Sequence, residues 1–209
     1  MSAALVAGLL AGYGIAIPVG AVGAYLVAVT ARTGWRTGAG AALGVATADG
    51  GYALLAVAGG SALVPLLTPV MTPLRWASAL VLAVLAVRGA YVALAAYRTG
   101  GLASRDDGAA LTPARAYLTF LGITILNPMT VLYFAALILA TGPSAPATPL
   151  DRTVFVLAAL VASASWQLLL ALGGTLLGRT LAGRRGRLVT ALASSTLIVV
   201  LAARLVASG

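Results

Sequence analysis

The sequence has no cysteine, histidine, lysine or glutamate, and these absences remove whole classes of chemistry. Without cysteine and histidine the chain forms no disulfide, has no thiolate or imidazole metal ligand, and supports neither Ser-His-Asp nor Cys-His catalysis. The only acidic residues are Asp49, Asp106, Asp107 and Asp151, and two of these share a loop with Arg105. We therefore expect no enzyme, no bound metal and no cofactor.

Charge of either sign is scarce. Of the 209 residues, 61% are hydrophobic and 8% are charged, whereas soluble domains carry about a quarter charged residues. The mean hydropathy is +1.06. Apolar runs of about 20 residues, the length that spans a bilayer, recur along the chain. We infer an integral membrane protein. The basic residues are all arginines and mostly flank apolar runs, so they indicate membrane topology rather than a nucleic-acid partner.

The apolar runs and the polar breaks between them predict six transmembrane helices, over residues 3–31, 38–61, 72–97, 115–140, 152–177 and 187–207. The first run has no basic start and continues to Arg32, so we interpret it as a retained helix rather than a signal peptide. Nine arginines lie in the first, third and fifth loops and three on the other side. The positive-inside rule places those loops in the cytoplasm and both termini outside.

The chain also repeats itself. GIAIPVGAVGAYLV in the first span resembles GITILNPMTVLYF in the fourth, and VATAD (45–49) resembles VASAS (161–165). A three-span unit repeated once enters the membrane in the opposite orientation, which makes an inverted repeat. We predict a single all-α transmembrane domain over 1–209, with repeat one at about 1–98, a cytoplasmic loop at about 98–115 and repeat two at about 115–209.

Two prolines fall at corresponding points of the two repeats, Pro18 in the first helix and Pro128 in the fourth. Proline inside a helix removes a backbone hydrogen bond at a cost of about 3 kcal/mol. A single proline indicates a kink, whereas a matched pair of interrupted helices indicates a binding site near the midplane of the bilayer. We expect Pro18, Gly20, Asn127 and Pro128 to line it, with Asn127 offering both a donor and an acceptor.

Two ionisable side chains are predicted deep in the membrane. At 1.5 Å per residue, Asp49 lies on the order of 20 Å from Arg36, and Arg88 on the order of 15 Å from Arg98. A charge at that depth costs at least about 3 kcal/mol, so it pairs or lines a cavity. One hypothesis is a structural Asp49–Arg88 ion pair. The other has Arg88 holding a substrate carboxylate and Asp49 holding an amine or a coupling proton.

For the other polar and small residues, a role in helix packing is the simpler explanation. Thr47, Ser163, Ser165 and Gln167 either line the same cavity or bond helices together. Tyrosines recur at depth and favour packing with a satisfied hydroxyl, namely Tyr25, Tyr52, Tyr91 and Tyr133. Small-x-x-x-small motifs let helices approach closely. They begin at Gly8, Gly40 and Gly174, favour internal packing, and also allow a homodimer.

Four segments together resemble the lysine-exporter (LysE) superfamily of bacterial amino-acid efflux carriers, which includes a homoserine/threonine-type branch. They are IPVGAVGAYLV, GAALGVATAD (40–49), RGAYVALAAYR (88–98) and LNPMTVLYF (126–134). The resemblance implies a secondary exporter in the bacterial inner membrane, driven by protons or the membrane potential. Its substrate is an amino acid or a related small cationic or zwitterionic metabolite.

The chain departs from the family pattern at several positions. Ala21 stands where a proline is expected, Val22-Gly23 replaces a polar pair, and Tyr133 stands in place of an aspartate. Asp49 keeps the acidic residue of the basic-amino-acid branch, but the substrate need not be lysine or arginine. Two alternatives remain, an inorganic-cation exporter and a non-transporting membrane subunit. The subunit hypothesis predicts Asp49 facing Arg88 in a dry core.

Overall fold

The computed structural model describes residues 2–18, 20–59, 68–98, 111–141, 148–180 and 183–207, and within them it contains α-helices and a short 3₁₀ helix but no strand. This confirms the all-helical prediction. The elements are α1 (Ser2–Ala16), α2 (Ala21–Thr33), α3 (Trp35–Gly59), η2 (Thr68–Val70), α5 (Met71–Arg98), α6 (Pro113–Ile125), α7 (Pro128–Thr141), α8 (Pro149–Thr180) and α9 (Arg184–Ala207).

Three helices, α3, α5 and α8, are each long and apolar enough to cross a membrane. The bent pairs α1–α2 and α6–α7 raise this number to five if each pair forms one span. The predicted sixth span is present as α9, within which Leu188–Arg204 form a shorter apolar helix that is not counted among these spans. The number of six spans is therefore not confirmed.

The helices break at both predicted prolines. α1 ends at Ala16 and α2 begins at Ala21, with 74° between them, and Pro18 lies in the gap. α6 ends at Ile125 and α7 begins at Pro128, with a bend of 59°. Pro128 occupies the first helical position, where a missing N–H removes no hydrogen bond. Each break is a change of direction with its own helix ends, rather than a kink in a continuous helix.

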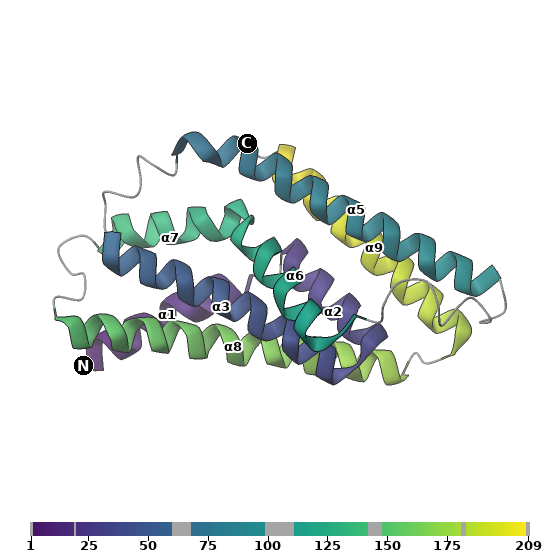
Figure 1. The fold of residues 1–209 in the computed structure, drawn as a ribbon, viewed down its shortest axis with the longest axis horizontal. Coiled ribbons are helices and arrows are strands. Elements are labelled where there is room, and N and C mark those ends of the chain that lie inside the picture. The colour runs from purple at the N-terminus through teal and green to yellow at the C-terminus, as the bar shows by residue number, and fades with distance from the viewer. Residues whose placement is uncertain are drawn as a thin grey trace.

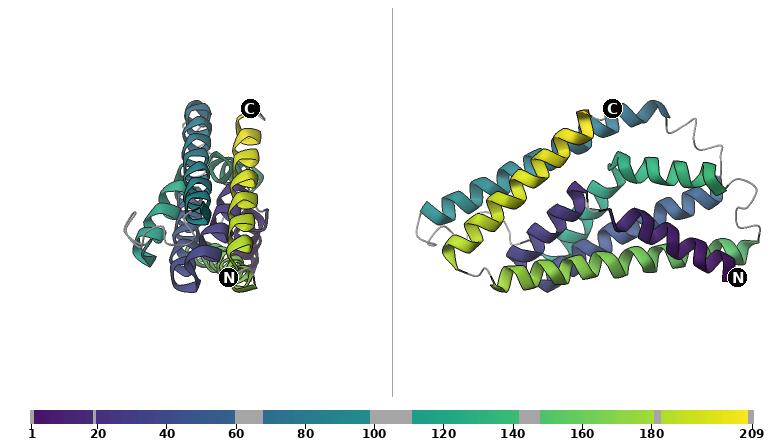
Figure 2. Two further views of the ribbon diagram at one scale, coloured as in Figure 1. Left: turned by 90° about the vertical axis from the view of Figure 1, so that its right-hand side faces the viewer. Right: turned by 180° about the vertical axis from the view of Figure 1, so that it is seen from behind.

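The helices pack as a bundle against which a separate pair lies obliquely. α8 contacts α1, α2 and α3, and α3 also contacts α6 and α7. α5 and α9 run side by side and cross the bundle diagonally (Figures 1 and 2). α2, which contacts both α8 and α9, connects the bundle to this pair. Both helix breaks and the diagonal pair line a common cavity.

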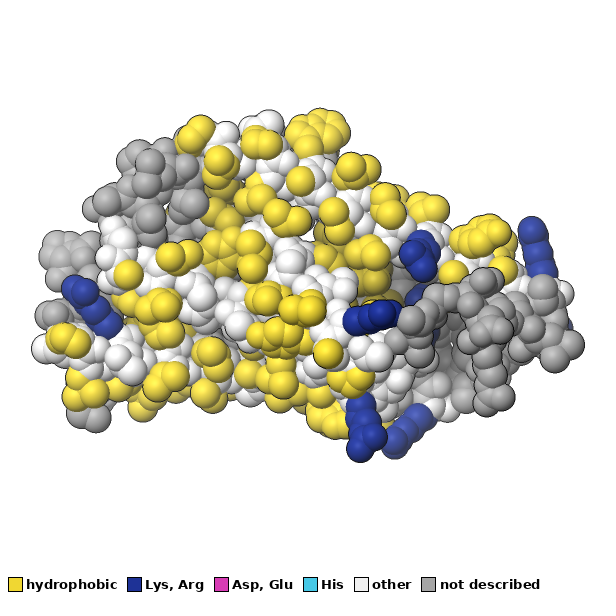
Figure 3. All heavy atoms as spheres, viewed as in Figure 1, with side chains coloured by type: hydrophobic (Ala, Val, Ile, Leu, Met, Phe, Trp, Pro, Cys, Tyr) yellow, Lys and Arg dark blue, Asp and Glu magenta, His cyan; other side chains and the backbone are white. Residues whose placement is uncertain are grey.

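Large apolar side chains cover the outside. Leu10, Trp76, Leu80 and Tyr91 are among the most exposed, at 61–74%. Figure 3 shows hydrophobic side chains spread over the whole visible face, with arginines gathered mainly toward its right-hand end. Water-soluble monomers rarely expose contiguous apolar patches larger than a few hundred Å². The surface therefore fits a lipid environment.

Glycines bring the helices into close contact, as the small-x-x-x-small motifs predict. A Cβ atom at any of the six motif positions would collide with the backbone of a neighbouring helix. Gly8 and Gly12 of α1 meet α8, Gly40 and Gly44 of α3 meet α6, and Gly174 and Gly178 of α8 meet α2. All three motifs serve packing within the chain.

Two glycines of α8 provide a matched test of this packing. At Gly178 an added Cβ would overlap the backbone of Ala31, whereas at Gly173 it would meet nothing within 4 Å. We expect Gly178→Ala to destabilise the protein by about 1–3 kcal/mol, the usual cost of overpacking. Gly173→Ala leaves stability unchanged or slightly raised. Thermal unfolding of both purified variants measures the difference, and equal melting temperatures would contradict the close α2–α8 contact.

Candidate functional site

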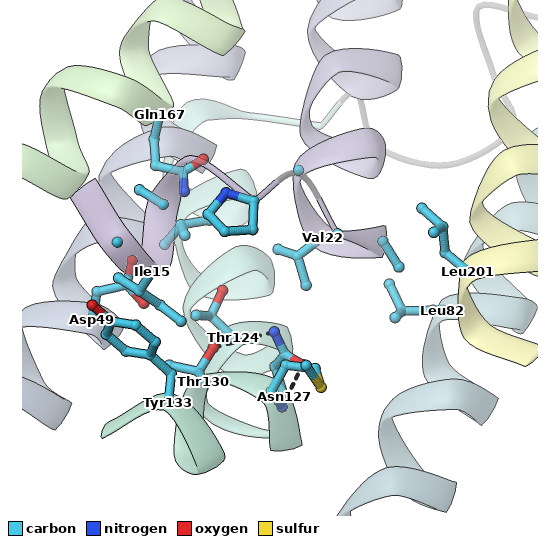
Figure 4. A pocket seen from close by; sticks show the side chains of 18 of the residues that line it. Ile15, Val22, Asp49, Leu82, Thr124, Asn127, Thr130, Tyr133, Gln167 and Leu201 are labelled. Atoms are coloured by element: carbon cyan, nitrogen blue, oxygen red, sulfur yellow. Dashed lines mark hydrogen bonds between the residues drawn. The ribbon is translucent and has the colours of Figure 1, made fainter. Parts of the chain in front are cut away.

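A cavity of about 690 Å³ lies between the two helix breaks (Figure 4). Its size falls within the range of roughly 300–1,000 Å³ that is typical of small-molecule sites. The first break contributes Pro18 and Gly20, and the second contributes Asn127. Asp49 enters from α3 and Gln167 from α8. The structure thus brings together residues from four segments that are far apart in the sequence.

Asp49 is the acidic group of this cavity. It is only 3% exposed, and its Oδ2 accepts a hydrogen bond from the Ser163 hydroxyl of α8 at 2.6 Å. Among the described residues, no arginine acts on its carboxylate. A buried carboxylate with one neutral partner is costly in a membrane unless a cation or a proton joins it. The position therefore suits a ligand ammonium group or a transported proton.

Arg88 lies elsewhere. It is exposed on α5 and is not among the residues that line the cavity. The neighbouring Gly89 packs within 3.0 Å of the Arg32 guanidinium, measured to an ideal Cβ, which places Arg88 near the end of α2. The hypothesis of a structural Asp49–Arg88 ion pair is therefore wrong for this structure.

A different arginine lines the cavity. Arg204, in the last turn of α9, lines it together with Leu201. In the sequence, Arg204 is one of the three arginines outside the first, third and fifth loops, and it lies at the end of an apolar run. Nothing in that run shows which way its side chain faces.

Asn127 caps the helix that follows it. Its side-chain Oδ1 accepts from the Met129 backbone N–H at 3.2 Å, and its Nδ2 donates to the Thr130 hydroxyl at 3.2 Å. Asn127 lines the cavity, while Pro128 is fully buried beside it and is not among the lining residues. Both polar ends of the Asn127 side chain therefore have a partner in the break that they stabilise.

Two buried oxygens in the cavity have no partner. Gln167 is 5% exposed and Thr124 is 2% exposed, and neither Gln167 Oε1 nor Thr124 Oγ1 has a hydrogen-bond partner among the described residues. Most buried polar atoms are hydrogen-bonded, so these two indicate a place for a ligand. Gln167 is one of the predicted candidates. Thr124 is not among the predicted candidates, although it lies three residues before Asn127 in the segment that carries the second break.

The remaining polar candidates bond helices together. Thr47 donates to the Leu43 carbonyl at 2.8 Å and accepts from the Tyr117 hydroxyl at 3.2 Å. Ser165 donates to the Ala162 carbonyl at 2.8 Å and pairs with the Tyr13 hydroxyl.

The deep tyrosines have mostly structural contacts. The Tyr133 hydroxyl, at the cavity wall, donates to the Ala11 carbonyl at 3.0 Å. The Tyr52 hydroxyl donates to the Ile125 carbonyl at the end of α6 at 2.6 Å, which fixes the second break against α3. Tyr25 stacks on Phe120 with ring centroids 5.1 Å apart. Tyr91 is exposed.

An all-helical chain with an apolar exterior, broken helices and a polar internal cavity defines a multi-pass membrane protein of the transporter class. The family model of the LysE type translocator matches residues 14–209, and the chain belongs to this family. This confirms the resemblance found in the sequence, and it places the protein in a family of transporters rather than enzymes. No curated protein and no solved structure shows a significant match to the chain.

The cap at Asn127 predicts a measurable contribution to stability. Asn127→Ala removes the acceptor for the Met129 N–H, and loss of such a cap costs about 0.5–2 kcal/mol. Asn127→Ser keeps a capping oxygen and retains most of that stability. The melting temperatures of the two variants in detergent test the prediction. Equal losses in both would show that the cap does not stabilise the break.

Proposed function

We propose that the protein is a secondary active exporter of an amino acid or a related small cationic or zwitterionic metabolite, located in the bacterial inner membrane. The observation that carries the proposal is the cavity between two interrupted helices with a buried carboxylate, Asp49, in its wall. Membership of a translocator family supports it. The hypothesis of a non-transporting subunit predicts a dry core with Asp49 facing Arg88, and neither feature is present in the described residues.

The proposal includes an inverted repeat of three spans. The broken helix α1–α2 packs on α8, and the broken helix α6–α7 packs on α3. Each broken helix therefore contacts the second span of the other half. The remaining pairs, α3 with α8 and α5 with α9, join equivalent elements of the two halves. A pseudo-twofold axis between the halves accounts for this pattern of contacts, and the cavity lies where such transporters bind their substrates.

The proposed sidedness has both termini outside. Most arginines in Figure 3 gather toward one side of the view. On that side α2, α5 and α8 finish, and α3, α6 and α9 begin. Arginine-rich loops stay in the cytoplasm under the positive-inside rule. This arrangement supports the prediction that the first, third and fifth loops are cytoplasmic.

In this mechanism Asp49 binds the ammonium group of the substrate or, alternately, a proton. A negative-inside potential opposes export of a cation by about 2.3 kcal/mol per charge per 100 mV. Exchange of the substrate for an incoming proton offsets that cost. Among the described residues that line the cavity, Asp49 is the acidic one, so it is the group we assign to this exchange. Pro18, Pro128 and Asn127 hold the helix ends around it.

Proton coupling is tested by one substitution with a matched control. Asp49→Asn keeps the size of the side chain but cannot exchange a proton, so we expect export driven by a pH gradient to be lost. Asp151→Asn makes the same change in the first turn of α8, outside the cavity lining, and retains coupling. Uptake of radiolabelled amino acids into everted vesicles, with and without an imposed pH gradient, measures both variants. Coupled transport by a folded Asp49→Asn variant contradicts the assignment.

Substrate binding is tested by thermal stabilisation of the purified protein against a panel of amino acids. A ligand present at 100 times its Kd adds about 2.7 kcal/mol to stability. We expect one class of amino acid to stabilise the wild type and Asp151→Asn, and to lose most of its effect with Asp49→Asn. Absence of stabilisation by every amino acid in the panel argues against the proposed substrate class.

A further inference from the structure

The two helix breaks differ in how their following helices begin. At the second break, the Asn127 side chain caps α7. At the first break the N-cap of α2 is Gly20, which has no side chain to offer. The backbone N–H groups of Ala21, Val22 and Gly23 have no acceptor among the described residues, and all three residues line the cavity. The open N-terminus of α2 therefore faces the same space as Asp49.

Such a helix start attracts an anion. The first N–H groups of a helix lack partners within the helix, and the aligned peptide dipoles give this end a partial positive charge. Inside a membrane, unsatisfied N–H groups are tolerated only where they are buried in protein or line a water-filled cavity. Carboxylates and phosphates both accept several such hydrogen bonds at once, and the carboxylate is the anionic group of an amino acid.

Independent evidence for a ligand comes from hydrogen-bond acceptors that have no donor. The unpartnered Gln167 Oε1 and Thr124 Oγ1, on side chains more than nine-tenths buried, line the same cavity. Figure 4 shows the Gln167 side chain pointing into the cavity, with Asp49 on one side, Leu201 on the other, and Val22 of the first turn of α2 between them. The cavity thus combines oxygens that accept hydrogen bonds with backbone groups that donate them.

We propose that the uncapped N-terminus of α2 binds the carboxylate of an amino-acid substrate, while Asp49 and Gln167 bind an ammonium group. This inference rests on the proposed exporter function and adds the recognition element for the anionic group. Arg204, which lines the same cavity, contributes further positive charge. One of the two hypotheses from the sequence has Arg88 holding the carboxylate, but Arg88 lies outside the cavity lining. The proposed site selects amino acids over amines that lack the carboxylate.

Gly20 allows a direct test because its backbone already has the conformation of an N-cap. Its φ of −91° and ψ of −167° suit any residue, and an added Cβ meets nothing within 4 Å. In Gly20→Asp, the new side-chain carboxylate caps α2 and occupies the place of the substrate carboxylate. Gly20→Ala adds the same Cβ without an acceptor and is the matched control.

The probes are amino acids paired with the amines that remain when the carboxylate is removed. They are L-lysine with cadaverine, L-threonine with 1-aminopropan-2-ol, and L-leucine with 3-methylbutylamine. Thermal-shift titration of the full chain gives the apparent Kd of each. We expect the wild type to bind one amino acid at least roughly tenfold more tightly than its amine, because the amine lacks the charged acceptor for the N–H groups of α2. Gly20→Ala measures how much of any loss in Gly20→Asp comes from the added carbon alone. Gly20→Asp loses that preference and keeps the affinity for the amine.

Three outcomes overturn the inference, and they differ in what they leave standing. In the first outcome, Gly20→Asp binds the amino acid as the wild type does, or binds the amino acid and the amine with equally reduced affinity. The N-terminus of α2 is then not the carboxylate site, but the exporter function stands. If Arg88→Ala removes the preference for the amino acid while Gly20→Asp keeps it, the carboxylate site is at Arg88. If the wild type binds neither the amino acids nor the amines, the proposed function fails together with the inference.

Discussion

Backbone hydrogen bonding in lipid is the constraint on which this structure depends. The hydrocarbon core of a membrane offers no water to exposed N–H and C=O groups, so the groups freed by an interrupted helix must be buried in protein or line a water-filled cavity. This chain interrupts two helices, at Pro18 and before Pro128, and closes the other helices around both breaks. The cavity, the cap at Asn127 and the contact from Tyr52 to the Ile125 carbonyl all result from this arrangement.

The breaks require close packing elsewhere. α8 continues as one helix from Pro149 to Thr180 and contacts both parts of the first broken span. Glycines at Gly8 and Gly12 on α1, and at Gly174 and Gly178 on α8, remove the side chains that would keep these helices apart. A continuous helix thus holds the two parts of a broken one in position. The direction change around Pro18 is fixed by packing as well as by proline.

The sequence predicted those features that depend on residue type alone. Proline in the interior of a helix removes a backbone hydrogen bond and kinks or breaks the helix, and an aspartate in an apolar span must be buried in a polar site, so both breaks and the burial of Asp49 were predictable. Glycine motifs similarly indicate close packing before any partner is known. These features need no information about which side of a helix faces the interior.

The features that the sequence did not predict depend on which way a side chain faces or a helix axis points. The spans are apolar on all sides, so no periodicity shows that Arg88 is exposed on α5 while Arg204 lines the cavity. The tilt of α5 is likewise absent from a count of residues. The two bonds of the Asn127 side chain depend on the local path of the backbone, which composition does not describe. Tertiary packing decides each of these points.

The length of α8 has a consequence for how the protein sits in the bilayer. The 32 residues of α8 extend for about 48 Å, whereas the hydrocarbon layer is roughly 30 Å thick. A helix longer than this layer tilts from the bilayer normal or extends beyond the layer at its ends. The charged residues Asp151 and Arg179, in the first and last turns of α8, suit ends that reach the polar headgroups.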